Sequence, residues 1–129
     1  MDTVRIVILC GYFGPDSKVE VEAYLTKTAG LFVHKTVNAA GIWQGTWSVT
    51  LGTAGYSVSP CYFRTRKDAI WYANLFGPHD WDGVTASNTH KHLTLRDKCH
   101  ALLLDNFTPD RWGRVATRSL PPAVKRGDE

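Results

Sequence analysis

The sequence lacks any apolar run that approaches the roughly 18 residues needed to span a membrane. Residues 1–5 also lack the basic start, long apolar segment and small-residue cleavage site of a secretory signal. We therefore expect a protein without membrane association that resides in the cytoplasm.

Cysteine is scarce and widely spaced. The three cysteines, Cys10, Cys61 and Cys99, form no Cys-x-x-Cys pair. This spacing excludes both a zinc ribbon and a thioredoxin-like motif. We expect three reduced thiols in or near the core.

Recognisable catalytic motifs are missing as well. The chain has no Gly-x-Ser-x-Gly turn and no glycine-rich phosphate loop. Cys99 and His100 are adjacent, but on a helix neighbouring side chains point about 100° apart. The sequence favours a protein that is not an enzyme and that needs no cofactor.

Excess charge of one sign is small and confined to one half of the chain. Residues 1–63 carry four basic and four acidic side chains, whereas residues 64–129 carry eleven basic and eight acidic ones, which gives the net charge of +3. This asymmetry falls short of the clustered footprint of a dedicated nucleic-acid binder. Nucleic-acid binding through Arg64, Arg66, Lys67 and the basic C-terminal half remains an alternative.

The N-terminal half shows the alternation of apolar and polar residues that is typical of half-buried strands. The first run is rich in β-branched residues and carries one charge, which predicts a central or near-central strand. The last run contains Pro60, which predicts an edge strand or a bulge there. The predicted strands are Val4–Leu9, Val19–Leu25, Leu31–Val37, Thr46–Leu51 and Tyr56–Phe63. The first two should pair as a hairpin.

Two helices follow. Thr65 is a favourable N-cap with Asp68 three residues later, and the Gly-Pro dipeptide at 77–78 predicts the end of that helix. A second helix is predicted from Thr94 to about Phe107, before Pro109. Their apolar faces are Ala69, Ile70, Ala73 and Phe76 in the first, and Leu95, Cys99, Leu102 and Leu103 in the second.

These elements predict the α+β class, with a mainly antiparallel sheet of about five strands and two helices packed on one face. Residues 1–120 should form a single domain. Residues 121–129 should be a disordered tail.

The segment from Trp47 to Phe76 resembles the AP2-like, arm-site-binding domains of phage integrases. Residues 63–69 (Phe-Arg-Thr-Arg-Lys-Asp-Ala) form the strand-to-helix corner that carries this likeness. The resemblance implies a sheet docked in the DNA major groove through basic strand residues. In this chain the polar positions of the two strands are instead hydroxyl-bearing, and we expect them to be exposed: Thr46, Ser48, Thr50, Ser57 and Ser59.

A second resemblance, to small uncharacterised proteins of actinobacteria and their phages, rests on three short motifs. They are Trp-Ser-Val-Thr at 47–50, Gly-Tyr-Ser-Val at 55–58 and the 63–69 corner. This resemblance implies an accessory role, in the host cytoplasm if a phage encodes the chain.

A cluster of histidine and aspartate lies between the two predicted helices. His90 and His92 would share one face of an extended strand, and carboxylates precede them in the same polar segment. Such groups bind zinc or non-haem metals. A metal-dependent enzyme built on His79, Asp82, His90 and His92 is therefore a further alternative.

Three tryptophans, Trp43, Trp81 and Trp112, fall in predicted loops. Tryptophan is enriched among the residues that dominate binding energy at protein interfaces. The leading hypothesis is a non-enzymatic protein-binding accessory module that uses these three residues, as a phage protein that engages a host factor or as a self-associating protein.

Overall fold

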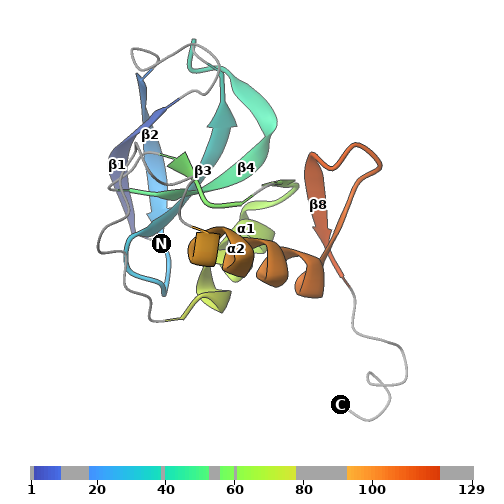
Figure 1. The fold of residues 1–129 in the computed structure, drawn as a ribbon. Helices are drawn as coiled ribbons and strands as arrows, with labels where there is room; N and C mark the ends of the chain where they lie inside the picture. The colour runs from blue at the N-terminus through green and yellow to red at the C-terminus, as the bar shows by residue number, and fades with distance from the viewer. Residues whose placement is uncertain are drawn as a thin grey trace.

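The computed structural model describes residues 2–9, 18–38, 40–52, 56–59, 61–77 and 93–119. In these segments two helices pack against one curled sheet (Figure 1). The strands are β1 (Thr3–Leu9), β2 (Lys18–Leu25), β3 (Leu31–Val37), β4 (Trp43–Leu51), β5 (Tyr56–Ser57), β6 (Tyr62–Phe63), β7 (Phe107–Pro109) and β8 (Val115–Arg118).

The sheet confirms the α+β class but has more strands than the five expected. Seven strands follow one another in the order β1-β2-β3-β4-β6-β8-β7, and the short β5 pairs with β4 beside them. All pairs are antiparallel except β6 with β8. The predicted run from Tyr56 to Phe63 is divided into β5 and β6, and both pieces pair with β4. Pro60 lies outside the described residues.

The N-terminal hairpin is confirmed, but the place of its first strand in the sheet is not. β1 and β2 pair over their full length, from Thr3 opposite Tyr24 to Leu9 opposite Lys18. β1 stands at the end of the strand order, so it is an edge strand and not a central one. Its apolar composition predicted burial on both sides, yet Val4 and Val7 are exposed.

The helix α1 (Arg66–Leu75) begins and ends as predicted. The Oγ1 of its N-cap, Thr65, accepts a hydrogen bond from the backbone N–H of Asp68 at 3.1 Å. Gly77 follows the helix with a φ of +60°, a conformation that glycine adopts without the steric cost of a side chain. α1 packs against β3, β4 and β6.

The helix α2 (Leu93–Asn106) also agrees with its predicted range. It contacts α1 and β7. The segment that follows is the main addition to the expected fold, because β7 and β8 form a hairpin that extends the sheet beyond β6. Figure 1 shows this hairpin standing beside α2 at the side of the molecule away from β1. Residues 121–129 lie outside the described residues.

The centre of the fold is a group of aromatic side chains that we call the core aromatic cluster: Phe63, Trp71, Tyr72, Phe76 and Phe107. Ring centroids lie 5.0 Å apart for Phe63 and Phe107, and 5.1 Å apart for Phe63 and Tyr72. The hydroxyl of Tyr72 donates to the carbonyl oxygens of Cys99 and Val58, at 3.1 and 3.3 Å. This cluster joins both helices to the sheet.

The hydroxyl-bearing face of β4 is buried, which contradicts the expectation that it would be exposed. Ser48 and Thr50 are buried together with His34 and Thr36 of β3. His34 Nε2 lies 2.7 Å from the Thr50 hydroxyl, and the hydroxyls of Thr36 and Ser48 are 2.6 Å apart. The polar side chains on these strands therefore satisfy one another inside the protein, as buried polar groups must.

Candidate functional site

A groove with a volume of about 310 Å³ lies on the face of the sheet that α1 packs against. On β3 and β4, Leu31, Val33, Val49 and Leu51 of this face belong to the core beneath α1. Lys35 and Trp47 are on the same face and pair with each other further along the two strands. The groove is lined by Arg5, Glu20, Val21, Glu22, Tyr24, Lys35, Val37, Gly41 and Trp47.

Three aromatic side chains follow one another along this region, and we call them the groove aromatic cluster: Tyr24, Trp47 and Trp43. The ring centroids of Tyr24 and Trp47 are 6.3 Å apart, and those of Trp47 and Trp43 are 6.1 Å apart. Both contacts have the edge-to-face geometry that aromatic pairs prefer. Tyr24 and Trp47 also pack on the core, whereas Trp43 is 48% exposed.

An irregularity in β4 brings the two tryptophans together. Four residues of regular strand span about 13 Å, yet the rings of Trp43 and Trp47 are separated by 6.1 Å. The register between β3 and β4 shifts at this point, and Gly45 has a φ of +85°. Such a bulge shortens and bends the strand. The indole N–H of Trp43 then donates to the carbonyl oxygen of Thr46 at 2.9 Å, which fixes its ring.

Two cations lie against this cluster. The Nζ of Lys35 is 4.8 Å from the centroid of the Trp43 ring. The guanidinium of Arg66, the first residue of α1, is 4.5 Å from the centroid of Tyr24 and donates to its hydroxyl at 2.8 Å. Cation–π contacts of this kind are attractive by about 0.5–1 kcal/mol at exposed sites, so they favour these side-chain positions.

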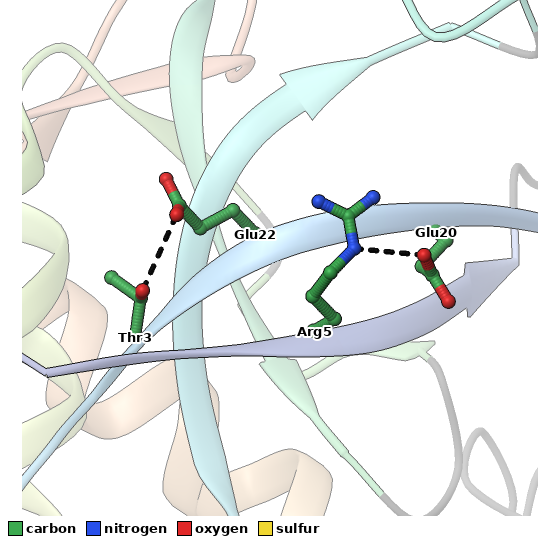
Figure 2. A network of polar contacts seen from close by, with 4 residues as sticks. All are labelled: Thr3, Arg5, Glu20 and Glu22. Atoms are coloured by element: carbon green, nitrogen blue, oxygen red, sulfur yellow. Dashed lines mark hydrogen bonds and ion pairs between the residues drawn. The ribbon is translucent and has the colours of Figure 1, made fainter.

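The hairpin β1–β2 lines the groove with Arg5, Glu20 and Glu22. Figure 2 shows the polar contacts of these three side chains. The Nε of Arg5 donates to Glu20 at 2.8 Å, in an ion pair whose two side chains are mostly exposed. The hydroxyl of Thr3 donates to Glu22 at 3.3 Å. These contacts hold the two carboxylates on the groove side of the hairpin, and solvent screening keeps their contribution to stability small.

The three tryptophans of the leading hypothesis do not form one site. Trp43 belongs to β4 and not to a loop, and it contacts Trp47 and Lys35. Trp112 is 70% exposed in the turn between β7 and β8, where Arg111 stacks on its ring at 4.7 Å. Trp81 lies outside the described residues. Trp43 does not line the groove itself but contacts two residues that do, Trp47 and Lys35.

The basic residues of the nucleic-acid alternative diverge. Arg66 reaches back to Tyr24 on β2, whereas Arg64 donates to the hydroxyl of Thr117 on β8 at 3.0 Å. Lys67 is exposed on the first turn of α1. Arg64 and Arg66 therefore contact two different strands of the sheet.

The proposed metal ligands His79, Asp82, His90 and His92 all lie outside the described residues. Within the part of the chain that the structure describes, no group of three histidine, cysteine or acidic side chains could hold a metal ion. No helix in that part is long and apolar enough to cross a membrane.

The two described cysteines have the environment of structural thiols. Cys61 and Cys99 are buried and free, as expected. Burial raises the pKa of both thiols, to about 11 for Cys99, and the nearby carboxylate of Asp110 raises the pKa of Cys61 further. Since the thiolate is the reactive form, neither group is suited to nucleophilic chemistry at neutral pH.

Tyr24, Lys35 and Trp47 were not identified as site residues from the sequence. Trp47 reads as a core residue because it alternates with serine and threonine. The available signal is Gly45, since an isolated glycine inside a strand pattern indicates a bulge. The pairing of Lys35 with Trp47 depends on the β3–β4 register, which alternation alone does not specify.

Comparison of the chain with protein-family models, with curated proteins and with solved structures finds no match.

Proposed function

We propose that this protein is a non-enzymatic protein-binding module and that the groove aromatic cluster is its binding surface. The observation that carries the proposal is the Tyr24–Trp47–Trp43 series beside a groove on a part of the sheet face beyond the core. An accessory role, a cytoplasmic location and the likeness to small actinobacterial and phage proteins stay predictions.

The composition of this surface supports a protein ligand. Tryptophan, tyrosine and arginine are enriched at the centres of protein interfaces, where they contribute most of the binding energy. Trp43 and Tyr24 are held by neighbours and by the cations of Lys35 and Arg66. A surface held in this way loses little side-chain entropy when a partner binds.

The charges around the groove specify the chemistry of the partner. Three cations (Arg5, Lys35 and Arg66) and two carboxylates (Glu20 and Glu22) give a local net charge of +1. Among the described residues, Lys35 and Arg66 contact aromatic rings and no carboxylate. We infer a partner that places an apolar side chain against Trp47 and Trp43, with an acidic residue beside Lys35.

Site-specific photocrosslinking tests this surface. A benzoylphenylalanine installed at Trp43 should crosslink to a protein of the cell in which the chain is produced. The partner identified by mass spectrometry is then purified and crosslinked again. The matched control carries the same group at Leu104, an exposed apolar position of α2. Equal crosslinking at the two positions, or none at Trp43, would contradict the proposal.

A second function is favoured by a different observation, the arginine-aromatic pairs of the β7–β8 hairpin. Arg111 stacks on the exposed ring of Trp112, and the guanidinium of Arg118 lies 3.8 Å from the centroid of Trp71. Single-stranded nucleic acids stack their bases on exposed aromatic rings, and arginines beside those rings bind the phosphates. Arg64 lies next to this hairpin through Thr117.

Salt dependence distinguishes this second function from protein binding. If Arg64, Arg111, Arg114 and Arg118 each neutralise one phosphate, the logarithm of the binding constant for single-stranded DNA should fall with the logarithm of salt concentration with a slope of about −3. Trp112→Ala should weaken this binding, and Trp43→Ala should not. Absent or salt-independent DNA binding would eliminate nucleic acid as the ligand.

A further inference from the structure

Among the described residues, β1 is an edge strand without the usual protection of such strands. It stands at the end of the strand order, and no described strand pairs with its outer side. Natural proteins protect an edge with outward charges, proline, a bulge, a very short strand or a covering segment. β1 has seven residues, no proline and one charged side chain, Arg5, which Glu20 neutralises at 2.8 Å.

The hydrogen-bond pattern of the hairpin shows which backbone groups point outward. Leu25 donates its N–H to the carbonyl of Asp2, so Asp2 and Leu25 form a hydrogen-bonded pair just beyond the register of β1 and β2. Hydrogen-bonded pairs recur every second residue in an antiparallel ladder. Val4, Ile6 and Ile8 therefore bond to β2. The N–H and C=O groups at positions 3, 5, 7 and 9 point away from it.

The side chains of β1 also leave apolar surface at this edge. Val4 is 37% exposed and Val7 is 47% exposed. Val7 pairs with Glu20 and Val4 with Ala23, so the two valines lie on opposite faces of the sheet. A strand added at this edge would cover apolar surface on both faces while it bonds to the outward backbone groups.

We propose that a second copy of this chain occupies the edge, with the two β1 strands antiparallel and Ile6 on the two-fold axis. This register pairs all seven residues of one strand with the other copy and places Arg5 opposite Val7, and Thr3 opposite Leu9. Positions 3, 5, 7 and 9, whose backbone groups point outward, then form the hydrogen-bonded pairs. The interface is isologous, as two-fold interfaces are.

Charge and the number of paired residues select this register over its two neighbours. A two-fold axis at Arg5 would place two arginines directly opposite each other, which destabilises a strand pair. An axis at Val7 avoids that contact but pairs only five of the seven residues. With Ile6 on the axis, each arginine faces a valine of the other copy and keeps its own Glu20.

The dimer would have a definite arrangement of its two grooves. Antiparallel pairing of identical edges about an axis normal to the sheet makes one continuous sheet, so both groove aromatic clusters face the same side. Each groove lies between β2 and β3, so four strand spacings, roughly 19 Å, separate the two. The dimer does not depend on the proposed function.

Sedimentation equilibrium of the full chain tests the pairing. The wild type should sediment at twice the chain mass of 14.4 kDa. Val7→Lys places a lysine opposite Glu20 within one copy, but opposite Arg5 of the other copy in the dimer. We expect this variant to raise the dimer dissociation constant at least about tenfold, because like charges that meet across an interface are costly. Leu104→Lys, the matched control on α2, should leave the constant unchanged.

Two further measurements keep the test decisive if Val7→Lys folds poorly. Val7→Pro removes an outward N–H without removing a bond to β2, and it should also give a monomer. In the wild type, the amide N–H groups of Arg5 and Val7 should exchange faster on dilution, while that of Ile6 stays protected. A wild type that is monomeric at every concentration, or a dimer that both Val7 variants leave intact, would overturn the proposal.

Discussion

The core aromatic cluster and the groove aromatic cluster use the same kind of contact for different ends. Both consist of rings at tilted or edge-to-face angles, with centroids between 5.0 and 6.3 Å apart. Phe63, Tyr72 and Phe107 are buried by two helices and a sheet, whereas Trp43 is half exposed under Lys35. The first cluster joins the helices to the sheet, whereas the second ends at a half-exposed ring that lies outside the core.

One face of the sheet carries both the core beneath α1 and the proposed binding surface. Where α1 covers β3 and β4, the side chains of this face are aliphatic and fully buried. Beyond the part covered by the helix, the same face continues with Lys35, Trp47 and Trp43. There the aromatic rings contact the cations of Lys35 and Arg66. An aromatic surface that folding does not need for its core is available for a partner.

Removing the central ring of the core aromatic cluster should have the largest effect. Phe63 is fully buried and contacts Tyr72 and Phe107. Phe63→Ala should lower the free energy of unfolding by about 3–5 kcal/mol, because it removes buried surface and leaves a cavity. Urea denaturation measures this loss. A loss below about 1 kcal/mol would show that the cluster is not the centre of stability.

A substitution at Gly45 should change the backbone of β4 and so move the rings of the groove aromatic cluster. A side chain at a φ of +85° costs about 1–2 kcal/mol, although the space around Gly45 is open. Gly45→Ala should therefore lower stability by about that amount and change the near-ultraviolet circular dichroism of the Trp43–Trp47 pair. Gly41 has a similar φ of +79° but lies outside β4. The matched variant Gly41→Ala should therefore leave that signal unchanged.

The buried polar face behind the groove should make stability depend on pH. Burial lowers the pKa of His34 below its usual value of 6.5, and the hydrogen bond to the Lys35 carbonyl partly opposes this shift. Below pH 6.5 the unfolded chain therefore binds more protons than the folded one, so stability should fall with decreasing pH by at most about 1.4 kcal/mol per pH unit. Above pH 6.5 this contribution should be constant. Thermal unfolding of His34→Gln should lack the fall.

Trp43→Ala should have the smallest effect on stability. The side chain is half exposed and makes one aromatic and one cation–π contact besides its hydrogen bond. We expect a loss below about 1 kcal/mol in urea denaturation, since exposed contacts of this kind contribute little. A loss as large as that of Phe63→Ala would place Trp43 in the structural core and remove the contrast between the clusters.

The sequence predicts the parts of the fold that depend on local pattern. The caps of α1, the range of α2 and the β1–β2 hairpin follow from Thr65, from the position of Pro109 after α2 and from strict alternation. These signals lie within a few residues of the structure that they predict, so no distant contact has to be known to interpret them.

Long-range pairing decides what the sequence does not predict. β7 and β8 are short strands, and β8 is held by a parallel pair with β6 about fifty residues earlier in the chain. Burial of Ser48 and Thr50 depends on hydrogen bonds to Thr36 and His34 of β3. The sequence does not predict the groove for the same reason, because Tyr24, Lys35 and Trp47 come from three strands whose register alternation alone does not specify.

The proposed binding surface is tested most directly by the affinity of Trp43→Ala for the partner identified by photocrosslinking, measured by titration calorimetry beside the wild type and Leu104→Ala. Trp43→Ala should bind about 30-fold more weakly, as expected for a central interface tryptophan worth about 2 kcal/mol. Leu104→Ala should bind like the wild type. Equal affinity of the wild type and Trp43→Ala would contradict the assignment of this surface to binding.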